Sequence, residues 1–157
     1  MKGSAGQEIS ISGYFEIGLF YAKREVNVGT LWRSAHQLGA AGIFTIGRRY
    51  RQQASDITKS KYHIPLRHYE TFDGFLSDRP EGAVLVGIET GGIPLSHFRH
   101  PTQAIYLLGA EDYGLPEKVL RQCNLVVSLE SIGPPSYNVA VAGSIVMYHR
   151  VFITKSS

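Results

Sequence analysis

The chain has 157 residues and carries 16 basic and 13 acidic side chains, so its formal net charge is +3. This length suits one domain with a complete core, and a hydrophobic content of 43% excludes a disordered chain. The single cysteine, Cys123, excludes an intrachain disulfide framework or a cysteine-rich zinc module, and it fits a reducing cytoplasm.

The first twelve residues differ in character from the rest of the chain. Residues 1–12 are small and polar, without the apolar core of a secretory signal, and we expect a flexible N-terminal tail there. No repeat or linker divides the remainder, so residues 13–157 are predicted to form one domain. The longest apolar stretch, 139–148, contains Gly143 and Ser144 and is too short to cross a bilayer, so no membrane partner is expected.

Short apolar runs alternate with helical patterns along the chain. Aromatic and β-branched residues or continuous apolar runs predict strands at 14–21, 42–46, 64–69, 83–88, 104–108 and 125–129. Apolar residues at helical spacing predict helices over 28–39 and 139–151. This alternation predicts an α/β domain with a mostly parallel sheet flanked by helices.

Ligands of a parallel sheet bind at the carboxyl ends of its strands. Four loops rich in Gly, Pro, Asn or Ser are expected there, at 24–30, 89–94, 109–116 and 130–138.

The first of these loops contains Asn27, with Arg33 six residues further on. Asn27 is a good N-cap for the following helix, and Arg33 has an equally ordinary reading as a solvated helix side chain. On one continuous helix the two side chains would point about 120° apart. They can therefore converge on a substrate only if Asn27 lies just before the helix.

The loops at 109–116 and 130–138 offer further polar groups. Glu111 and Asp112 are either exposed acids in a turn or carboxylates held at a strand end beside a ligand. Ser136 and Asn138 precede the last predicted helix, where both residue types form caps and where polar ligand groups are also well placed.

Several common sites are not supported. The glycine loop at 109–116 lacks the Lys-Ser or Lys-Thr of a P-loop, and no dinucleotide-binding glycine pattern is present. The six histidines form no compact ligand motif, so no metal is expected.

A basic segment runs from residue 48 to residue 61, with interleaved tyrosines. It is either a solvated face or a phosphate-contacting patch for single-stranded or looped RNA, and its composition favours neither. Its cations are Arg48, Arg49, Arg51, Lys59 and Lys61.

Three motifs together carry a family resemblance. They are NVGTLWRSA at 27–35, LLGAEDYGLP at 107–116 and SYNVAVA at 136–142. In this order and spacing, the chain resembles the SpoU-type (SPOUT superfamily) RNA 2′-O-ribose methyltransferases in their minimal single-domain form, from about residue 14 to residue 151. Two departures stand out: residues 129–131 replace the usual Ile-Pro-Met, and Tyr137 replaces a leucine.

The resemblance implies a C-terminal deep trefoil knot, bound S-adenosylmethionine and a cytoplasmic homodimer that methylates a ribose 2′-hydroxyl of tRNA or rRNA. By position, the cofactor would lie against Ile88, Gly109, Leu129 and Ser136. The family's catalytic positions are matched by Asn27, Arg33, Glu111, Ser136 and Asn138.

The chemistry of ribose methylation suits these residue types. The 2′-hydroxyl must be aligned with the methyl donor and must lose its proton during transfer. The family proposal makes Arg33 activate the hydroxyl, but a guanidinium is never deprotonated in a protein. We therefore expect Arg33 to hold a phosphate and to stabilise developing negative charge, while Asn27, Ser136 and Asn138 orient it and Glu111 supports them.

Two alternatives remain open from the sequence. The departures in the third motif favour a catalytically silent RNA-binding protein of the same fold. A nucleotide-binding α/β protein of ordinary topology is weakened by the missing phosphate motifs, and a purely structural protein has no feature in its favour.

Overall fold

The computed structural model describes residues 13–50 and 64–154. Within them, six strands form one sheet in the order β3-β2-β1-β5-β4-β6, and every neighbouring pair is parallel. The strands are β1 (Tyr14–Phe20), β2 (Gly42–Ile46), β3 (Leu66–Tyr69), β4 (Val84–Pro94), β5 (Gln103–Leu108) and β6 (Leu125–Ser128). The predicted parallel sheet flanked by helices is confirmed.

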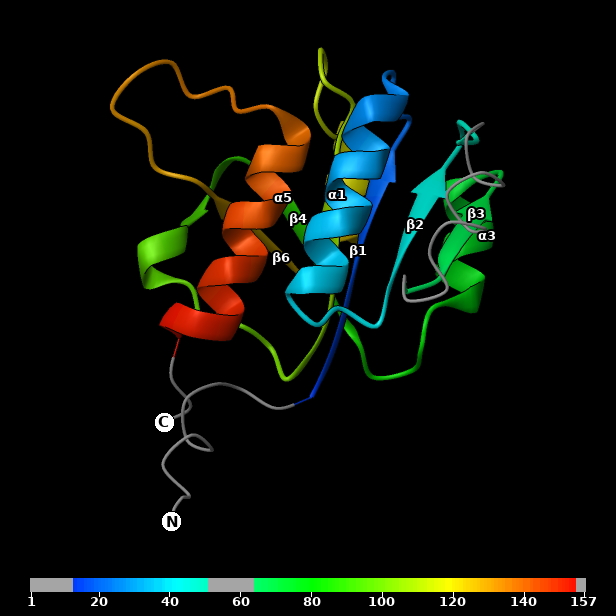
Figure 1. The fold of residues 1–157 in the computed structure, drawn as a ribbon, viewed down its shortest axis with the longest axis horizontal. Coiled ribbons are helices and arrows are strands. Elements are labelled where there is room, and N and C mark those ends of the chain that lie inside the picture. The colour runs from blue at the N-terminus through cyan, green and yellow to red at the C-terminus, as the bar shows by residue number, and fades with distance from the viewer. Residues whose placement is uncertain (1–12, 51–63, 155–157) are drawn as a thin grey trace.

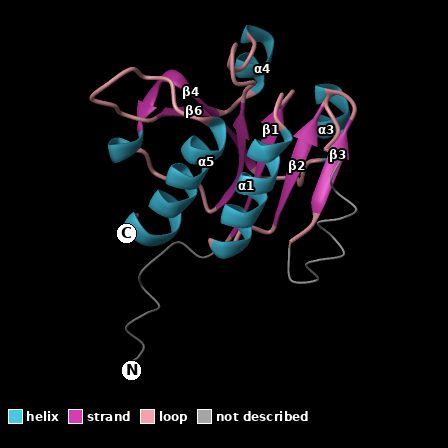
Figure 2. Ribbon diagram, turned by 45° about the horizontal axis from the view of Figure 1, so that its top comes forward, coloured by secondary structure: helices cyan, strands magenta, loops and turns pink. Residues whose placement is uncertain are grey.

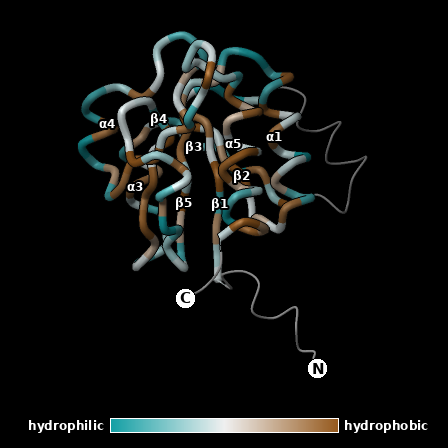
Figure 3. The backbone as a smooth tube through the Cα atoms, turned by 90° about the vertical axis from the view of Figure 1, so that its left-hand side faces the viewer, coloured by the Kyte–Doolittle hydropathy of each residue, from teal (hydrophilic) through white to brown (hydrophobic). Residues whose placement is uncertain are grey.

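Helices cover both faces of this sheet. Figure 3 shows the hydrophobic strands between two layers of helices. Figure 1 shows α1 and α5 side by side on one face of the sheet. The helices are α1 (Glu25–Gln37), α3 (Phe72–Asp78), α4 (Glu117–Gln122) and α5 (Val139–Tyr148), with a 3₁₀ turn η2 (Leu95–His97) and a π-helical turn η3 (His149–Ile153). The helix predicted over 139–151 therefore changes to π geometry after Tyr148.

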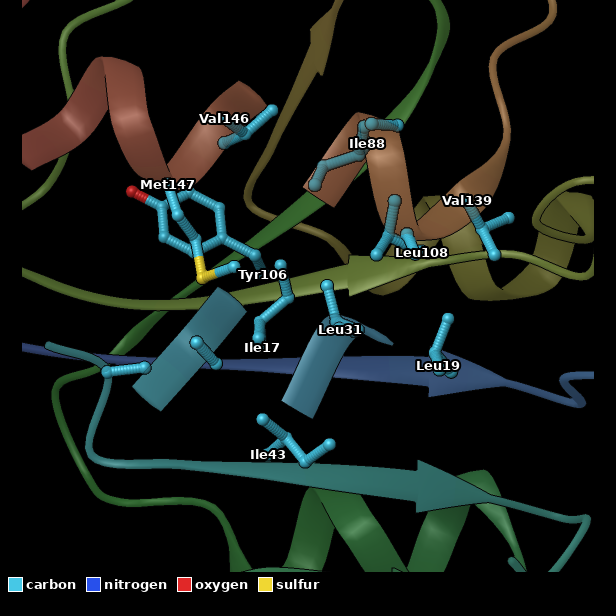
Figure 4. Close-up of a cluster of buried hydrophobic side chains, with 14 of the residues drawn as sticks. Ile17, Leu19, Leu31, Ile43, Ile88, Tyr106, Leu108, Val139, Val146 and Met147 are labelled. Carbon is cyan, nitrogen blue, oxygen red and sulfur yellow. The ribbon is translucent and has the colours of Figure 1, made fainter. Parts of the chain in front are cut away.

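Alternating strand residues build two cores. Ile17 and Tyr106 point toward α1 and α5, in the larger core drawn in Figure 4. Phe44 and Leu107 point the other way, toward α3 and α4. Buried apolar side chains on both faces explain why these strands have continuous apolar sequences, as parallel strands do.

Close contact between α1 and α5 depends on a small residue. A Cβ atom on Gly143 would lie 2.7 Å from Cδ1 of Leu31, which is fully buried. Burial of a leucine side chain of this kind contributes about 1.5–3 kcal/mol. The two helices thus pack as a pair, and their N-termini reach the carboxyl edge of the sheet together (Figure 2).

Two expectations about loops were wrong. The predicted loop at 89–94 belongs to β4, although its register against β6 breaks there: Ile88 and Ile93 both lie opposite Val127. The predicted loop at 24–30 is mostly helical, because α1 begins at Glu25.

The sequence analysis also missed α3 and α4, which contribute Phe75 and Val119 to the smaller core. The expected tail at 1–12 and the segment 51–63, which holds Arg51, Lys59 and Lys61, lie outside the described residues.

Candidate functional site

The strand order places a ligand crevice between β1 and β5. The connection after β1 runs through α1 to β2 on one side, whereas β4 and β6 lie on the other side of β5. Parallel sheets bind ligands at such a reversal, outside the carboxyl ends of the two strands. The segments that meet there are the loop after β1, the loop after β5 and the start of α5.

Glu111 is the centre of the contacts in this crevice. Its Oε1 accepts a hydrogen bond from the backbone N–H of Lys23 (3.0 Å), and its Oε2 accepts one from Nδ2 of Asn27 (2.7 Å). The adjacent acid, Asp112, pairs with the ammonium group of Lys23. Two polar contacts from the loop after β1 and one from the first turn of α1 therefore hold the loop after β5.

Asn27 carries this network on to α5. Its Oδ1 accepts a hydrogen bond from Nδ2 of Asn138 (3.1 Å). Oδ1 of Asn138 in turn accepts from the N–H groups of Ala140 (2.9 Å) and Val141 (3.1 Å), so Asn138 is the N-cap of α5, as predicted. Because both Nδ2 and Oδ1 of Asn27 form hydrogen bonds, the orientation of its side-chain amide is fixed.

Hydrogen bonding keeps Glu111 ionised. Burial raises the pKa of its carboxyl, but donors from Lys23, Asn27, Arg24 and its own backbone outweigh that effect and hold the pKa below its usual value. The network thus contains a fixed negative charge at neutral pH.

A cavity of about 260 Å³ opens beside Glu111 at the ends of β4 and β5. This volume lies just below the usual range for small-molecule sites, roughly 300–1,000 Å³. Its wall combines apolar and polar side chains, and it includes all four positions expected to contact the cofactor: Ile88, Gly109, Leu129 and Ser136. The structure brings these four residues together.

The backbone after β5 is folded too tightly for a side chain at Gly109. A Cβ atom there would lie 2.2 Å from the carbonyl carbon of Gly114 and 2.4 Å from the nitrogen of Leu115. Glu89 accepts a hydrogen bond from Leu115 N–H (2.8 Å) and closes the turn against β4. Main-chain groups therefore line this part of the cavity, as expected for a ligand held by the backbone.

The loop at 130–138 is held by hydrogen bonds at the positions where its sequence departs from the family pattern. The Tyr137 hydroxyl donates to the carbonyl of Glu130 (2.6 Å). The Glu130 carboxylate accepts from the N–H (3.2 Å) and the hydroxyl of Ser96 in η2. Tyr137 and Glu130 thus hold the loop, drawn in orange in Figure 1, by polar contacts.

A second cavity, of about 570 Å³, adjoins the first one. Four of the five expected catalytic residues line it: Asn27, Glu111, Ser136 and Asn138. The same cavity is lined by Lys23 and Arg24, which the sequence analysis did not single out, and by Arg48, Asp112 and Tyr137, which it named without giving them a catalytic role. The available signal was the pair Lys23-Arg24 directly after an apolar strand.

Arg33 does not join the other four. Asn27 lies inside α1, two residues after its first residue, and does not cap the helix; the N-cap is Arg24. The expected N-cap role of Asn27 was therefore wrong, and the two side chains leave the helix in directions about 120° apart. Arg33 is exposed and lines a separate depression with Val26 and Tyr50.

Among residues 13–50 and 64–154, no three His, Cys, Asp or Glu side chains gather as a metal-binding group. In the same ranges no helix has the length and apolar character needed to span a membrane.

An all-parallel sheet with helices on both faces, and with two adjoining cavities at the carboxyl ends of its strands, is typical of an α/β domain that binds a ligand there. The chain belongs to the SpoU rRNA Methylase family, whose model matches residues 15–148. The family expected from the three motifs is confirmed.

A relative from Archaeoglobus fulgidus, known as an uncharacterized tRNA/rRNA methyltransferase, is 28% identical over 128 residues. The match covers 78% of this chain and 57% of that protein, so the chain spans little more than half the length of this relative.

Solved structures have the same fold. One, described as giving structural insights into the 2-OH methylation of C/U34 on tRNA, matches with a TM-score of 0.77 and 25% identity, over 88% of this chain and 94% of that one. The SpoU methyltransferase AviRb from Streptomyces viridochromogenes, in complex with the cofactor AdoMet, matches with a TM-score of 0.76 and 22% identity, over 94% of this chain and 63% of that one.

Proposed function

We propose that this chain transfers a methyl group from S-adenosylmethionine to a ribose 2′-hydroxyl of tRNA or rRNA. The observation that carries the proposal is the network of Glu111, Asn27 and Asn138, built from all three family motifs beside a backbone-lined cavity. Family membership supports it, and so does the neighbour described for 2-OH methylation on tRNA.

The first cavity fits the cofactor. Its tight turn at Gly109 leaves main-chain groups facing the space, and Ile88 and Leu129 supply an apolar wall suited to an adenine ring. Gly109, Ile88, Leu129 and Ser136 would hold S-adenosylmethionine, which supplies an electrophilic methyl group when bound. Tyr137, fastened to Glu130, supports this wall in place of the family's usual sequence.

The adjoining cavity would hold the ribose. Ser136 and Glu111 line both cavities, so the 2′-hydroxyl is aligned where the two spaces meet. Asn27 and Asn138 fix this junction. Their amide groups are already engaged with Glu111 and the start of α5, so we assign them positioning roles.

Arg33 of the same chain does not line the cavity that would hold the ribose. A permanently charged guanidinium stabilises the negative charge that develops on the hydroxyl oxygen as its proton leaves. Because Arg33 of the same chain lines a separate depression, we propose a homodimer in which a second copy contributes this residue.

An exposed apolar stripe supports the homodimer. On the outward side of α5 and η3, four large hydrophobic side chains recur at spacings of four, three and four residues, which aligns them along one helical face. They are Val141, Ile145, Tyr148 and Phe152. An apolar groove of about 510 Å³, lined by Leu38 and Ile145 among others, runs beside this stripe.

The trefoil knot and a cytoplasmic location belong to the same proposal. The cavity is walled by residues 88–90 within β4 and by the segments that follow β5 and β6, and such a knot would draw these parts of the chain together. The lone cysteine is compatible with a reducing compartment.

Transfer of labelled methyl from S-adenosylmethionine to total tRNA, and separately to rRNA, tests the reaction. The labelled RNA is digested to nucleosides, and Arg33→Ala serves as the control. We expect a 2′-O-methyl nucleoside from the unmodified chain and loss of most turnover, with cofactor binding intact, in Arg33→Ala. Failure of the unmodified chain both to bind S-adenosylmethionine and to transfer methyl would favour the silent RNA-binding alternative.

A further inference from the structure

The second cavity, beside the proposed cofactor cavity, is lined by cationic side chains that have no role in the proposed reaction. Its wall contains the cations Lys23, Arg24 and Arg48 and the carboxylates of Glu111 and Asp112. Both carboxylates are already engaged: Asp112 pairs with Lys23, and Glu111 accepts hydrogen bonds from Lys23 and Asn27. The charges left for a ligand are therefore those of the two arginines.

Both arginines are exposed, and neither guanidinium forms an ion pair with a carboxylate within the described part of the chain. They come from different elements. Arg24 follows β1 and is the N-cap residue of α1, whereas Arg48 lies just beyond β2. A group that both of them contact must therefore lie across the loops that follow two adjacent strands.

Helix polarity adds to the charge. The N-termini of α1, at Arg24, and of α5, at Asn138, both border this cavity. These helices have 13 and 10 residues, and the partial positive charge at each N-terminus favours an anion. The arginine side chains and the two helix ends thus bring positive charge to one cavity, which the residues of the Glu111 network also line.

We infer that Arg24 and Arg48 form a phosphodiester subsite, which holds the RNA backbone next to the ribose that is methylated. The inference rests on the proposed function, because the junction with the cofactor cavity fixes where that ribose lies. Each planar guanidinium can donate two parallel hydrogen bonds to one phosphate group. Backbone phosphates are alike in every nucleotide, so this subsite positions the RNA and does not read its bases.

The neighbouring Arg49 provides a matched control. It is the next residue in the chain and is also exposed, but it does not line the cavity, and its guanidinium lies 4.0 Å from the carboxylate of Glu70. If RNA bound to a diffuse basic surface, Arg48 and Arg49 would contribute equally to binding. If it binds at a defined subsite, Arg48 should contribute and Arg49 should not.

The test measures binding of a fluorescein-labelled RNA stem-loop by anisotropy over a range of salt concentrations. We expect Arg24→Ala and Arg48→Ala each to raise Kd about tenfold, the value of one lost charge-assisted contact. Each should also reduce the magnitude of the salt slope by about 0.7–1. Arg49→Ala should leave both quantities within about twofold of the unmodified chain, and Arg48→Lys should restore part of the affinity, because it keeps the charge.

Methyl transfer and cofactor binding separate this inference from the proposed function. If the unmodified chain methylates RNA, Arg24→Ala and Arg48→Ala should raise KM for RNA and leave kcat and the calorimetric Kd for S-adenosylmethionine unchanged. Unchanged KM and salt slope in both variants, or equal losses in Arg48→Ala and Arg49→Ala, would overturn the subsite while the reaction stands. If RNA binding depends on the two arginines but no methyl is transferred, the two arginines still bind the RNA backbone, but the proposed reaction and the place of this subsite beside a methylated ribose both fail.

Discussion

The side-chain amides of Asn27 and Asn138 meet through a 3.1 Å hydrogen bond, although 111 residues separate them in the chain. Asn27 lies in the first turn of α1, and Asn138 is the N-cap of α5. The other end of the Asn27 amide donates to Glu111, after β5. The buried side chain of Asn27, in the first family motif, is therefore hydrogen-bonded to residues of the other two motifs.

Replacement of Asn27 tests this connection. Asn27→Ala removes a donor from Glu111 and an acceptor from Asn138 at a buried position, and we expect a loss of about 1–3 kcal/mol in the free energy of unfolding. Asn27→Asp keeps the acceptor but sets a second carboxylate against Glu111, so it should be the more damaging change at neutral pH. Chemical denaturation of both variants measures the difference, and a smaller loss in Asn27→Asp than in Asn27→Ala would contradict the assignment.

The sheet could be predicted from the sequence because each central strand carries its own signal. Ile43 is buried in the larger core and Leu107 in the smaller one, on opposite faces of the sheet. Because both faces are covered, the central strands have continuous apolar sequences, which predict strands without knowledge of the neighbouring strands. The second half of β4 has no such signal. Thr90, Gly91 and Gly92 are typical of a loop, and pairing of the following residues Ile93 and Pro94 with β6 makes them part of a strand.

The short helices were missed for a related reason. Six or seven residues are too few for a 3.6-residue period to be recognised, although the Thr71 side chain caps α3 by accepting from Gly74 N–H.

The site could be predicted only as a set of loops and motifs. Gly109 and Leu129 directly follow apolar strands, so the chain alone places them at the carboxyl edge of the sheet. That they would contact the cofactor was implied only by the family resemblance. The role of Asn27 could not, because a capping asparagine and one in the first turn have nearly the same local sequence. Its true partners, Glu111 and Asn138, are set by tertiary packing.

Glu111→Gln tests the charge in the network. The pKa of this carboxyl lies below its usual 4.5, so its contribution to stability is present above pH 4.5 and is lost as pH falls through the lower value of the folded state. At neutral pH we expect Glu111→Gln to lower the free energy of unfolding by about 1–2 kcal/mol. Urea denaturation at several pH values should show that the gap in the free energy of unfolding between the variant and the unmodified chain narrows below pH 4.5. A gap that stays constant over this range would show that the charge does not matter.

His100 gives a second pH dependence, remote from the site. It is buried, with Nδ1 2.6 Å from the Tyr106 hydroxyl and Nε2 2.9 Å from Nδ1 of His149. Burial, with smaller effects from His149 and Arg150, lowers the pKa of His100 from 6.5 to about 3. The unfolded chain therefore binds the proton more readily, so stability is complete above pH 6.5 and falls as pH decreases toward 3.

The limiting slope from one such group is about 1.4 kcal/mol for each pH unit. His100→Gln keeps hydrogen-bonding groups without this titration, and it should flatten the decrease in stability between about pH 6.5 and pH 5, above the range of ordinary carboxyl groups. Thermal or urea denaturation of the two proteins over this interval measures the slopes. Identical slopes would exclude His100 as their source.

The apolar stripe on α5 predicts the behaviour of the chain in solution. Ile145→Arg places a charge in the middle of the stripe and should raise the dissociation constant of the proposed homodimer by at least tenfold. Ile132→Arg is the control, since Ile132 is an exposed isoleucine that lies on the loop before α5 and not on the stripe. Analytical ultracentrifugation over a concentration series distinguishes them. A unmodified chain that remains monomeric, or equal dissociation by both changes, would count against the stripe as the dimer interface.

The turn at Gly109 yields the most direct test of the cofactor cavity. Gly109→Ala would bring a methyl group within 2.2–2.4 Å of the Gly114 and Leu115 backbone, so the turn must open and displace the groups that line the cavity. We expect calorimetric binding of S-adenosylmethionine to weaken by at least tenfold, with a loss of about 1–3 kcal/mol in stability from the forced backbone shift. Gly133→Ala makes the same change on the loop before α5, where a Cβ atom has no neighbour within 4 Å, and it should bind like the unmodified chain. Equal binding by the two variants would mean that the backbone after β5 does not hold the cofactor, and the cavity would have to bind something else.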